Sequence, residues 1–329
     1  MKTVPMRLLT ADEYYKTLVR VIPNAKKRVI IEAMIVLWDG RTLDVAPLLE
    51  AALHRGVKVG IVGDVYSRFE SKTAGIAQRG PHFDWPKTTK TNERLSAAGA
   101  DVYYFGHLGL NPFGGRSHTK ITIVDDIVYT FGGVNFTDSH LKHHDLMLER
   151  QDAALADQLE HLVQEIKKDQ VLPDITQKLD DSTTLLFDGG TPGGSAIYQA
   201  ACDIVATAKK VHLVSKMCPS GRLARLLNRT DSQLFFNRPE LEGLPANLAI
   251  IWDQRRFGIK NQYKGSQHIH AKFILAEEAD GTRHVISGSN NFSWRGIAYG
   301  TKEIAMHSTS SDLYDQFYAF MRQRIAAQD

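Results

Sequence analysis

The 329-residue sequence has few cysteines, little net charge and no long apolar run. Its two cysteines, Cys202 and Cys218, form no metal-type cluster, so we expect buried, reduced thiols. Forty basic residues against 37 acidic ones leave a net charge of only +3, which is not typical of a dedicated duplex-DNA binder. The apolar stretch at 29–38 contains Glu32 and is too short to span a bilayer. The first residues also lack the apolar core of a signal peptide. These absences predict a globular protein of the cytoplasm, with at most peripheral contact to a membrane.

One polar pattern occurs twice in the sequence. Each copy has a His-x-Lys triplet in an apolar strand, then a turn, then a Gly-x-x-Asn-Phe segment: His118, Lys120 and 132–136 in the first copy, and His270, Lys272 and 288–292 in the second. A third His-x-Lys triplet, at 140–142, has no Gly-x-x-Asn after it, and we interpret it as chance. Two copies in the same order indicate a duplicated unit.

Similarity between the two halves extends beyond these motifs. The Ala-Lys-Lys sequence at 25–27 recurs at 208–210, each time before an apolar strand. Asp145 and Glu303 each begin a later apolar strand, at equivalent points of the repeat. Glycine and proline break the periodicity within 169–194. We therefore predict two homologous domains, at 1–174 and 175–329.

The order of elements predicts an α/β fold. A helical pattern at 47–55 is followed by an apolar strand at 57–62, and such alternation recurs along the chain. Each domain is expected to be an α/β sandwich, a mixed sheet flanked by helices. A pseudo-twofold axis would relate the two domains and bring their motifs together.

The paired motifs suggest a single site for an anionic phosphodiester. Residues two apart on a strand share a face, so each motif histidine should lie beside its lysine. One neutral histidine would attack phosphorus, and the other, protonated, would give its proton to the leaving oxygen. This chemistry needs no metal and no cofactor. The expected hydrogen-bond donors to the phosphate oxygens are Lys120, Lys272, Asn135 and Asn291, with Ser289 as a further phosphate contact.

Four acidic residues near the motifs receive different interpretations. Asp145 and Glu303 could each orient a histidine, or could be solvated strand ends. Asp125 and Glu277 lie five residues beyond their lysines, about 16 Å along an extended strand, so we expect them to stabilise the hairpin turns instead. His143 and His144 precede Asp145, but neighbouring strand residues face opposite ways, which argues against a metal site.

These motifs resemble those of the phospholipase D superfamily, which carries two His-x-Lys-x4-Asp signatures, each with a Gly-x-x-Asn downstream. His118, Lys120, Asp125 and Asn135 match the first signature, and His270, Lys272 and Asn291 match the second, where Glu277 replaces the aspartate. The chain is most similar to bacterial cardiolipin synthase-like phosphatidyltransferases. The resemblance implies phosphatidyl transfer between lipid alcohols, or phospholipid hydrolysis, through a phospho-histidine on His118.

The predicted partner is a phospholipid at a membrane surface, for a monomer that binds the inner membrane peripherally. An apolar loop at 108–113, beside His118, would make this contact. The alternative is a phosphodiesterase that cleaves nucleic acid with the same histidines, because several basic residues at 68–90 could bind a phosphate backbone. A binding protein without catalysis is disfavoured, since both His-Lys pairs are intact.

Overall fold

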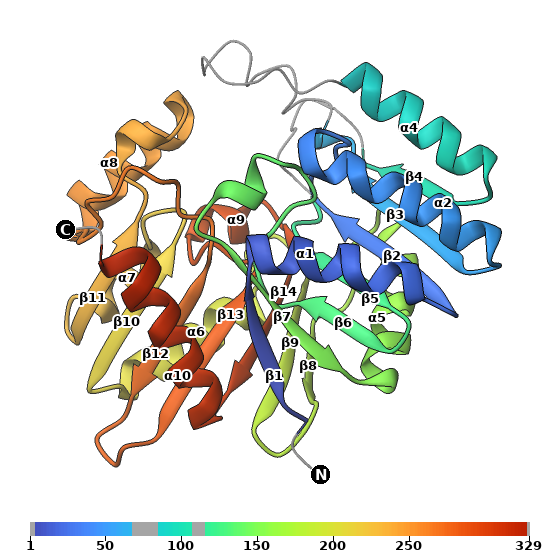
Figure 1. Cartoon of the computed structure of the whole chain (residues 1–329). Helices are drawn as coiled ribbons and strands as arrows, with labels where there is room; N and C mark the ends of the chain where they lie inside the picture. Colours follow the sequence, from blue (N-terminus) through green and yellow to red (C-terminus); the bar gives the residue numbers. More distant parts are fainter. Residues whose placement is uncertain (1–3, 68–84, 107–115, 328–329) are drawn as a thin grey trace.

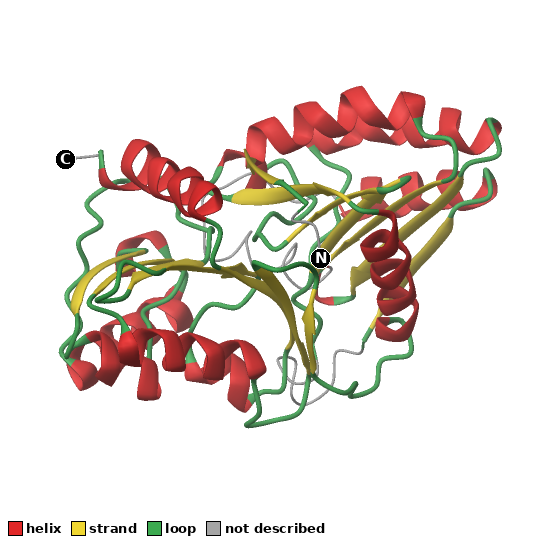
Figure 2. Cartoon of the chain, turned by 90° about the horizontal axis from the view of Figure 1, so that it is seen from below, coloured by secondary structure: helices red, strands yellow, loops and turns green. Residues whose placement is uncertain are grey.

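The computed structural model describes residues 4–67, 85–106 and 116–327. The chain forms two mixed seven-stranded sheets with helices packed against them (Figures 1 and 2). The predicted α/β class, with a mixed sheet and flanking helices in each half, is confirmed. Two predictions involve residues outside the described ranges. They are the apolar loop at 108–113 and the basic patch, of which Arg68, Lys72 and Arg79 are not described.

The first sheet is built from the first half of the chain. Across the sheet the strands are β1 (Met6–Thr10), β7 (Leu146–Gln151), β6 (Ile127–Thr130), β5 (Lys120–Val124), β2 (Arg28–Ala33), β3 (Lys58–Asp64) and β4 (Asp101–Phe105). The pairs β2–β3 and β3–β4 are parallel, and the other pairs are antiparallel. Its helices are α1 (Ala11–Val21), α2 (Ala46–His54), α4 (Trp85–Ala97) and α5 (Ala153–Ile166).

The second sheet follows the same plan. Across the sheet the strands are β8 (Ile175–Lys178), β9 (Thr183–Gly189), β14 (Lys302–Ser308), β13 (Arg283–Gly288), β12 (Phe273–Glu277), β10 (Lys210–Ser215) and β11 (Asp231–Phe236). Only β10–β11 is parallel. The helices are α6 (Ala196–Thr207), α7 (Gly221–Leu227), α8 (Leu244–Phe257), α9 (Trp294–Ala298) and α10 (Ser311–Phe320), and a π-helical turn, Met321–Ala326, continues α10.

Six strands correspond between the sheets in the same spatial order, as the sequence repeat requires. The order β1-β7-β6-β5-β2-β3 matches β9-β14-β13-β12-β10-β11. The first sheet adds β4 beside β3, and the second adds β8 beside β9. The helices after β7 and β14 begin alike, because Asp152 caps α5 and Ser310 caps α10 at positions 158 residues apart. The extra length of the first half therefore includes α4, which carries Lys87 and Lys90, and β4.

One apolar cluster joins the two halves. It contains Ile121 of β5 and Leu159 of α5 from the first half, together with Phe273 of β12 and Phe317 of α10 from the second. All four side chains are buried. Because burial of such side chains is the main stabilising contribution to folding, this shared core fixes the two sheets relative to each other and so positions the motif strands.

Candidate active site

Backbone bridges between the halves position the two motif histidines. Ser117 bridges Lys302 at the start of β14, and Ile269 bridges His144 just before β7. The N–H of His118 donates to the carbonyl of Lys302 at 2.8 Å, and the N–H of His270 donates to that of His144 at 2.9 Å. Each motif histidine is therefore held by a backbone segment from the other half. The sequence predicted that each histidine and its lysine lie within a strand, and the structure differs. β5 begins at Lys120, after His118, and β12 begins at Phe273, after both His270 and Lys272, because the preceding segments pair with the other half.

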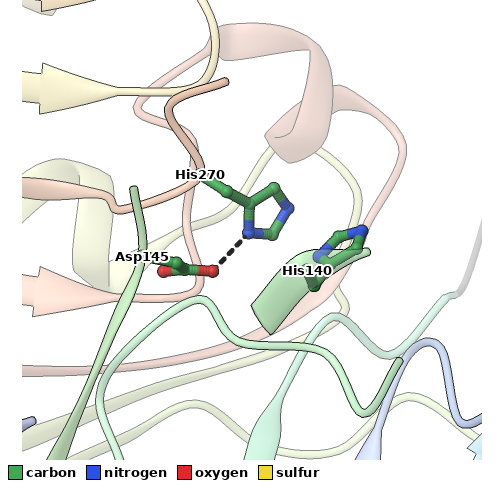
Figure 3. A group of neighbouring side chains, drawn as sticks. All are labelled: His140, Asp145 and His270. Carbon is green, nitrogen blue, oxygen red and sulfur yellow. Dashed lines mark hydrogen bonds and ion pairs between the residues drawn. The ribbon is translucent and has the colours of Figure 1, made fainter. Parts of the chain in front are cut away.

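Each histidine is hydrogen-bonded to the acid of the opposite half. His118 Nδ1 lies 3.1 Å from both carboxylate oxygens of Glu303, and His270 Nδ1 lies 2.7 Å from Asp145 Oδ2. Figure 3 shows Asp145 pointing at the ring of His270. The acids are buried rather than solvated strand ends. A carboxylate on Nδ1 leaves Nε2 as the nitrogen for chemistry, so these contacts suit orienting residues.

The side chain of each motif lysine turns back toward the backbone of its histidine. Lys120 Nζ donates to the carbonyl oxygen of His118, and Lys272 Nζ donates to that of His270. Lys272 Nζ also lies 3.0 Å from Nδ1 and 3.3 Å from Nε2 of the His270 ring. Both lysines are buried. Lys272 thus lies directly beside the imidazole ring of its own half.

The motif glycines allow this close packing. A Cβ on Gly133 would lie 2.6 Å from Asp145 Oδ1, 2.6 Å from the carbonyl oxygen of His270 and 2.9 Å from Lys272 Nζ. A Cβ on Gly288 would lie 2.3 Å from the carbonyl oxygen of Ile304. A larger residue at 133 would therefore displace groups of the site. Gly132 and Gly288 are the glycines of the two Gly-x-x-Asn segments, and both face backbone, since a Cβ on Gly132 would lie 1.9 Å from the carbonyl oxygen of Leu146. This close approach is a physical reason for glycine at both positions.

Among the predicted phosphate contacts of the Gly-x-x-Asn segments, Asn135 and Ser289 already have hydrogen-bond partners. Asn135 Oδ1 accepts from the N–H of Ile35 at 3.2 Å, and its Nδ2 lies 3.2 Å from His140 Nδ1. Asn291 Oδ1 is buried and has no hydrogen-bond partner among the described residues. Ser289 donates its hydroxyl to Glu303 and accepts from the N–H of Ile304. These contacts suit Ser289 to positioning Glu303 better than to the predicted direct phosphate contact.

Asp125 and Glu277 lie at the far ends of the motif strands. Asp125 follows β5 and accepts hydrogen bonds from three consecutive N–H groups, at residues 26–28, with distances of 2.7 to 3.1 Å. Its carboxylate thus ties the β5–β6 turn to the start of β2. Glu277 is the last residue of β12 and lies opposite Lys210 of β10 in the antiparallel register of the two strands. The contacts of Asp125 suit the expected structural role, and the role of Glu277 stays a prediction.

Burial controls protonation in the site. It lowers the pKa of His118 to about 4, although Glu303 opposes the shift, and it lowers the pKa of His270 well below the ordinary 6.5. Burial likewise lowers the pKa of Lys120 to about 8. It raises the pKa of Asp145, against the opposing charge of Lys272. Both imidazoles are therefore neutral at neutral pH, and the negative charge of a bound phosphodiester would raise their pKa values.

Three further histidines surround His270, and none of them was assigned a role in the site from the sequence. The ring centroid of His140 is 4.5 Å from that of His270 and 4.8 Å from that of His143. The His143 ring in turn lies 4.6 Å from that of His268, which pairs with Glu242 at 2.7 Å. A signal was present, since His268 precedes His270 by two residues and His143 precedes Asp145 by two, the spacing that shares a strand face.

His140, Asp145 and His270 offer three ligand atoms within 4.8 Å of one another (Figure 3). Imidazole and carboxylate are suitable ligands for a transition metal. However, Asp145 and His270 are already hydrogen-bonded to each other, and a metal ion would remove the bond that orients the histidine. The arrangement is therefore better suited to holding an imidazole than to holding a resident metal, and metal-free chemistry stays a prediction.

The first half of the chain is similar to a known protein family. Residues 18–167 match the family described as "Cardiolipin synthase, PLD-like domain". This match covers 150 of the 329 residues, and together with the paired motifs it supports a cardiolipin synthase-like protein of the phospholipase D superfamily.

Individual relatives support this placement. Cardiolipin synthase B of Salmonella typhi is 29% identical over 145 residues, and that of Shigella flexneri is 27% identical over 143 residues. Each match covers 42% of this chain and 30% of the relative, so the matched region spans less than a third of these curated proteins. Of the solved structures, phosphatidylserine synthase from Haemophilus influenzae Rd KW20 has a TM-score of 0.68 at 14% identity, with 97% of this chain and 86% of that one covered. Polyphosphate kinase from Porphyromonas gingivalis has a TM-score of 0.60 at 14% identity, covering 95% and 46%. These structures share the fold.

Proposed function

We propose that the chain catalyses phosphodiester transfer through a phospho-histidine, moving a phosphatidyl group between phospholipid alcohols and hydrolysing the phospholipid when water is the acceptor. The observation that carries this proposal is the crossed pairing of two histidines with two buried acids around one site. The similarity of residues 18–167 to cardiolipin synthases supports a lipid substrate.

His118 is the proposed nucleophile and His270 the proposed acid and base. In the first step His118 Nε2 bonds to phosphorus, the bond to the departing alcohol oxygen breaks, and His270 gives that oxygen a proton. In the second step an acceptor alcohol or water loses its proton to His270 and attacks phosphorus, and the N–P bond breaks. His118 is the more accessible imidazole, with 13% of its side chain exposed against 3% for His270, which supports this assignment.

The remaining groups would stabilise charge or hold the histidines in place. Lys120, Lys272 and Asn291 donate to the non-bridging oxygens as charge develops. Asn135 contributes its second N–H while the first contacts His140. Glu303 and Asp145 keep the Nδ1 proton on their histidines and stabilise the imidazolium form. No step is assigned to a metal or cofactor. Because one chain supplies both histidines, a monomer suffices.

The lipid surface is the proposed place of reaction. None of the helices in the described parts of the chain is long and apolar enough to cross a bilayer. The proposed contact is peripheral, at the inner membrane.

A substrate panel tests the proposal. Vesicles of phosphatidylglycerol, vesicles of phosphatidylcholine, and single- and double-stranded DNA are offered to one enzyme preparation, with His118→Ala and His270→Ala as controls. We expect cardiolipin-type product or phosphatidic acid from phosphatidylglycerol, absent in both variants. Cleavage of DNA that depends on both histidines, without a lipid product, would replace the lipid assignment by a nuclease.

A further inference from the structure

Helix α8 presents an apolar face to solvent. Of the eight large apolar or aromatic side chains exposed in the described residues, five lie on or directly after α8 and α9: Leu244, Leu248, Trp252, Trp294 and Tyr299. Leu244 is 70% exposed, Leu248 57% and Trp252 58%. Their spacing of four residues places them in one row, about 12 Å long at 1.5 Å per residue. A row of exposed apolar side chains on a protein surface marks a contact with an apolar partner.

A basic cavity adjoins this row. The cavity, of about 710 Å³, lies between α6, α7, α8 and α9, and Trp252 of the row is also one of its walls. Arg225 and Arg256 line it and have no carboxylate partner among the described residues, whereas Arg295 pairs with Asp253. Exposed apolar side chains and unneutralised arginines thus share one face of the molecule, which we call the α8 face: Leu244, Leu248, Trp252, Trp294, Arg225 and Arg256.

One end of the α8 face lies close to the motif histidine His270. Glu242, two residues before Leu244, binds His268, whose ring centroid lies 6.4 Å from that of His270. At the other side, Trp294 follows Asn291 by three residues, and its N–H donates to Ser220 Oγ at 2.9 Å. Figure 1 shows α8 at the upper edge of the molecule. A partner bound at this face would therefore lie next to the site.

We propose that the α8 face docks onto the surface of a lipid bilayer with anionic head groups. The leucines and tryptophans would enter the boundary between head groups and acyl chains, and the arginines would bind phosphate groups at the cavity mouth. Nucleic acid fits this face less well, because Leu244 and Leu248 can neither stack on bases nor donate hydrogen bonds. The inference rests on the proposed lipid substrate and adds the surface through which the enzyme reaches it.

The test separates docking from catalysis. One variant combines Leu244→Ser, Leu248→Ser and Trp252→Ser, and a second combines Arg225→Gln and Arg256→Gln. The control is Val171→Ser, since Val171 is 58% exposed but precedes β8, at the opposite edge of the sheet from β11 and α8. Binding to phosphatidylglycerol and phosphatidylcholine vesicles is measured by sedimentation. Turnover is measured on the same vesicles and on bis(p-nitrophenyl) phosphate, a soluble diester.

We expect the triple variant to lose vesicle binding and vesicle turnover about tenfold or more, with turnover of the soluble diester within about twofold of wild type. The arginine variant should lose binding to phosphatidylglycerol vesicles at low salt, and the difference from wild type should shrink as salt screens the charges. Val171→Ser should behave as wild type.

Unchanged vesicle binding and turnover in the triple variant would overturn the docking proposal and leave the proposed chemistry standing. So would a triple variant that loses DNA binding while vesicle binding persists, or one that changes only the oligomeric state in light scattering. If wild type turned over neither vesicles nor the soluble diester, the proposed function itself would fail.

Discussion

At the residue scale, the crossed contacts assign a specific partner to each histidine. Glu303→Gln should lower the pKa of His118 below about 4, because Glu303 now raises it against burial, while the signals of His270 stay nearly unchanged. Asp145→Asn should do the reverse. Imidazole ¹⁵N NMR over a pH series measures both. An Asp145→Asn variant that perturbs His118 more than His270 would contradict the crossed arrangement.

The side chains that would touch phosphate should dominate turnover. His118→Ala and His270→Ala are expected to remove nearly all activity, because the two groups serve one reaction. Lys120→Ala and Lys272→Ala should each lower kcat on the order of a hundredfold, the usual cost of one transition-state donor. Steady-state kinetics on the soluble diester gives the values.

Glu277→Asp should change turnover little, and a loss as large as that of Lys272→Ala would put Glu277 in the site.

Asp125 should matter for stability rather than for catalysis. Removing its carboxylate in Asp125→Ala leaves three backbone N–H groups without their acceptor, at an expected cost of about 1 to 3 kcal/mol. Chemical denaturation measures this cost, and kcat of the folded fraction should match wild type. Asp126→Ala is the control, since the exposed Asp126–Lys27 pair should contribute less than about 1 kcal/mol. A large fall in kcat for Asp125→Ala would contradict this role.

At the scale of elements, Gly133 is the tightest point of the site. Gly133→Ala would push a methyl group against Asp145, the backbone of His270 and Lys272, so we expect kcat to fall at least about a hundredfold. Gly296→Ala, in α9, is the matched control: a Cβ there meets nothing within 4 Å, and alanine favours a helix. Activity near wild type in Gly133→Ala would contradict the claim that the site has no room for a Cβ at this position.

The sequence predicted the elements better than it predicted their partners. The apolar runs of β2 and β3 and the helical pattern of α2 follow from local periodicity, so their existence could be predicted. The bridges from Ser117 to Lys302 and from Ile269 to His144 join residues more than a hundred positions apart, and no local pattern encodes them. Comparing the repeats identified Asp145 and Glu303 as equivalent, but could not say which histidine each would contact. The dismissed triplet at 140–142 shows the same limit, because His140 matters through its contact with His270.

At the scale of the whole molecule, the proposed mechanism makes the two halves one site that shares a proton. In this mechanism the reactive form has one histidine neutral and the other protonated. In the free enzyme the pKa values of His118 and His270 both lie below 6.5. Above pH 6.5 the shared proton is therefore lost. At a pH below both pKa values, each ring carries its own proton. The profile of kcat/KM should therefore be bell-shaped with its maximum below pH 6.5, and the alkaline limb of kcat should lie at higher pH, because bound phosphate raises both pKa values. A kcat/KM maximum above pH 7 would contradict this account.

Activity should also survive chelation, because no step is assigned to a metal. Turnover of the soluble diester after dialysis against EDTA is expected to equal that of untreated enzyme. A loss that Mg²⁺ or Zn²⁺ restores would instead assign a metal to His140, Asp145 and His270, the group whose ligand atoms lie within 4.8 Å.

The most direct test of a single shared site is a rapid-quench experiment with bis(p-nitrophenyl) phosphate. Its leaving group departs without a proton, so His270→Ala should release about one equivalent of p-nitrophenol in a burst and retain a phospho-adduct on His118, mapped by mass spectrometry. His118→Ala should show no burst, and neither variant should turn over. About half of wild-type turnover in each single variant would contradict the account, because it would mean that each half carries its own complete site.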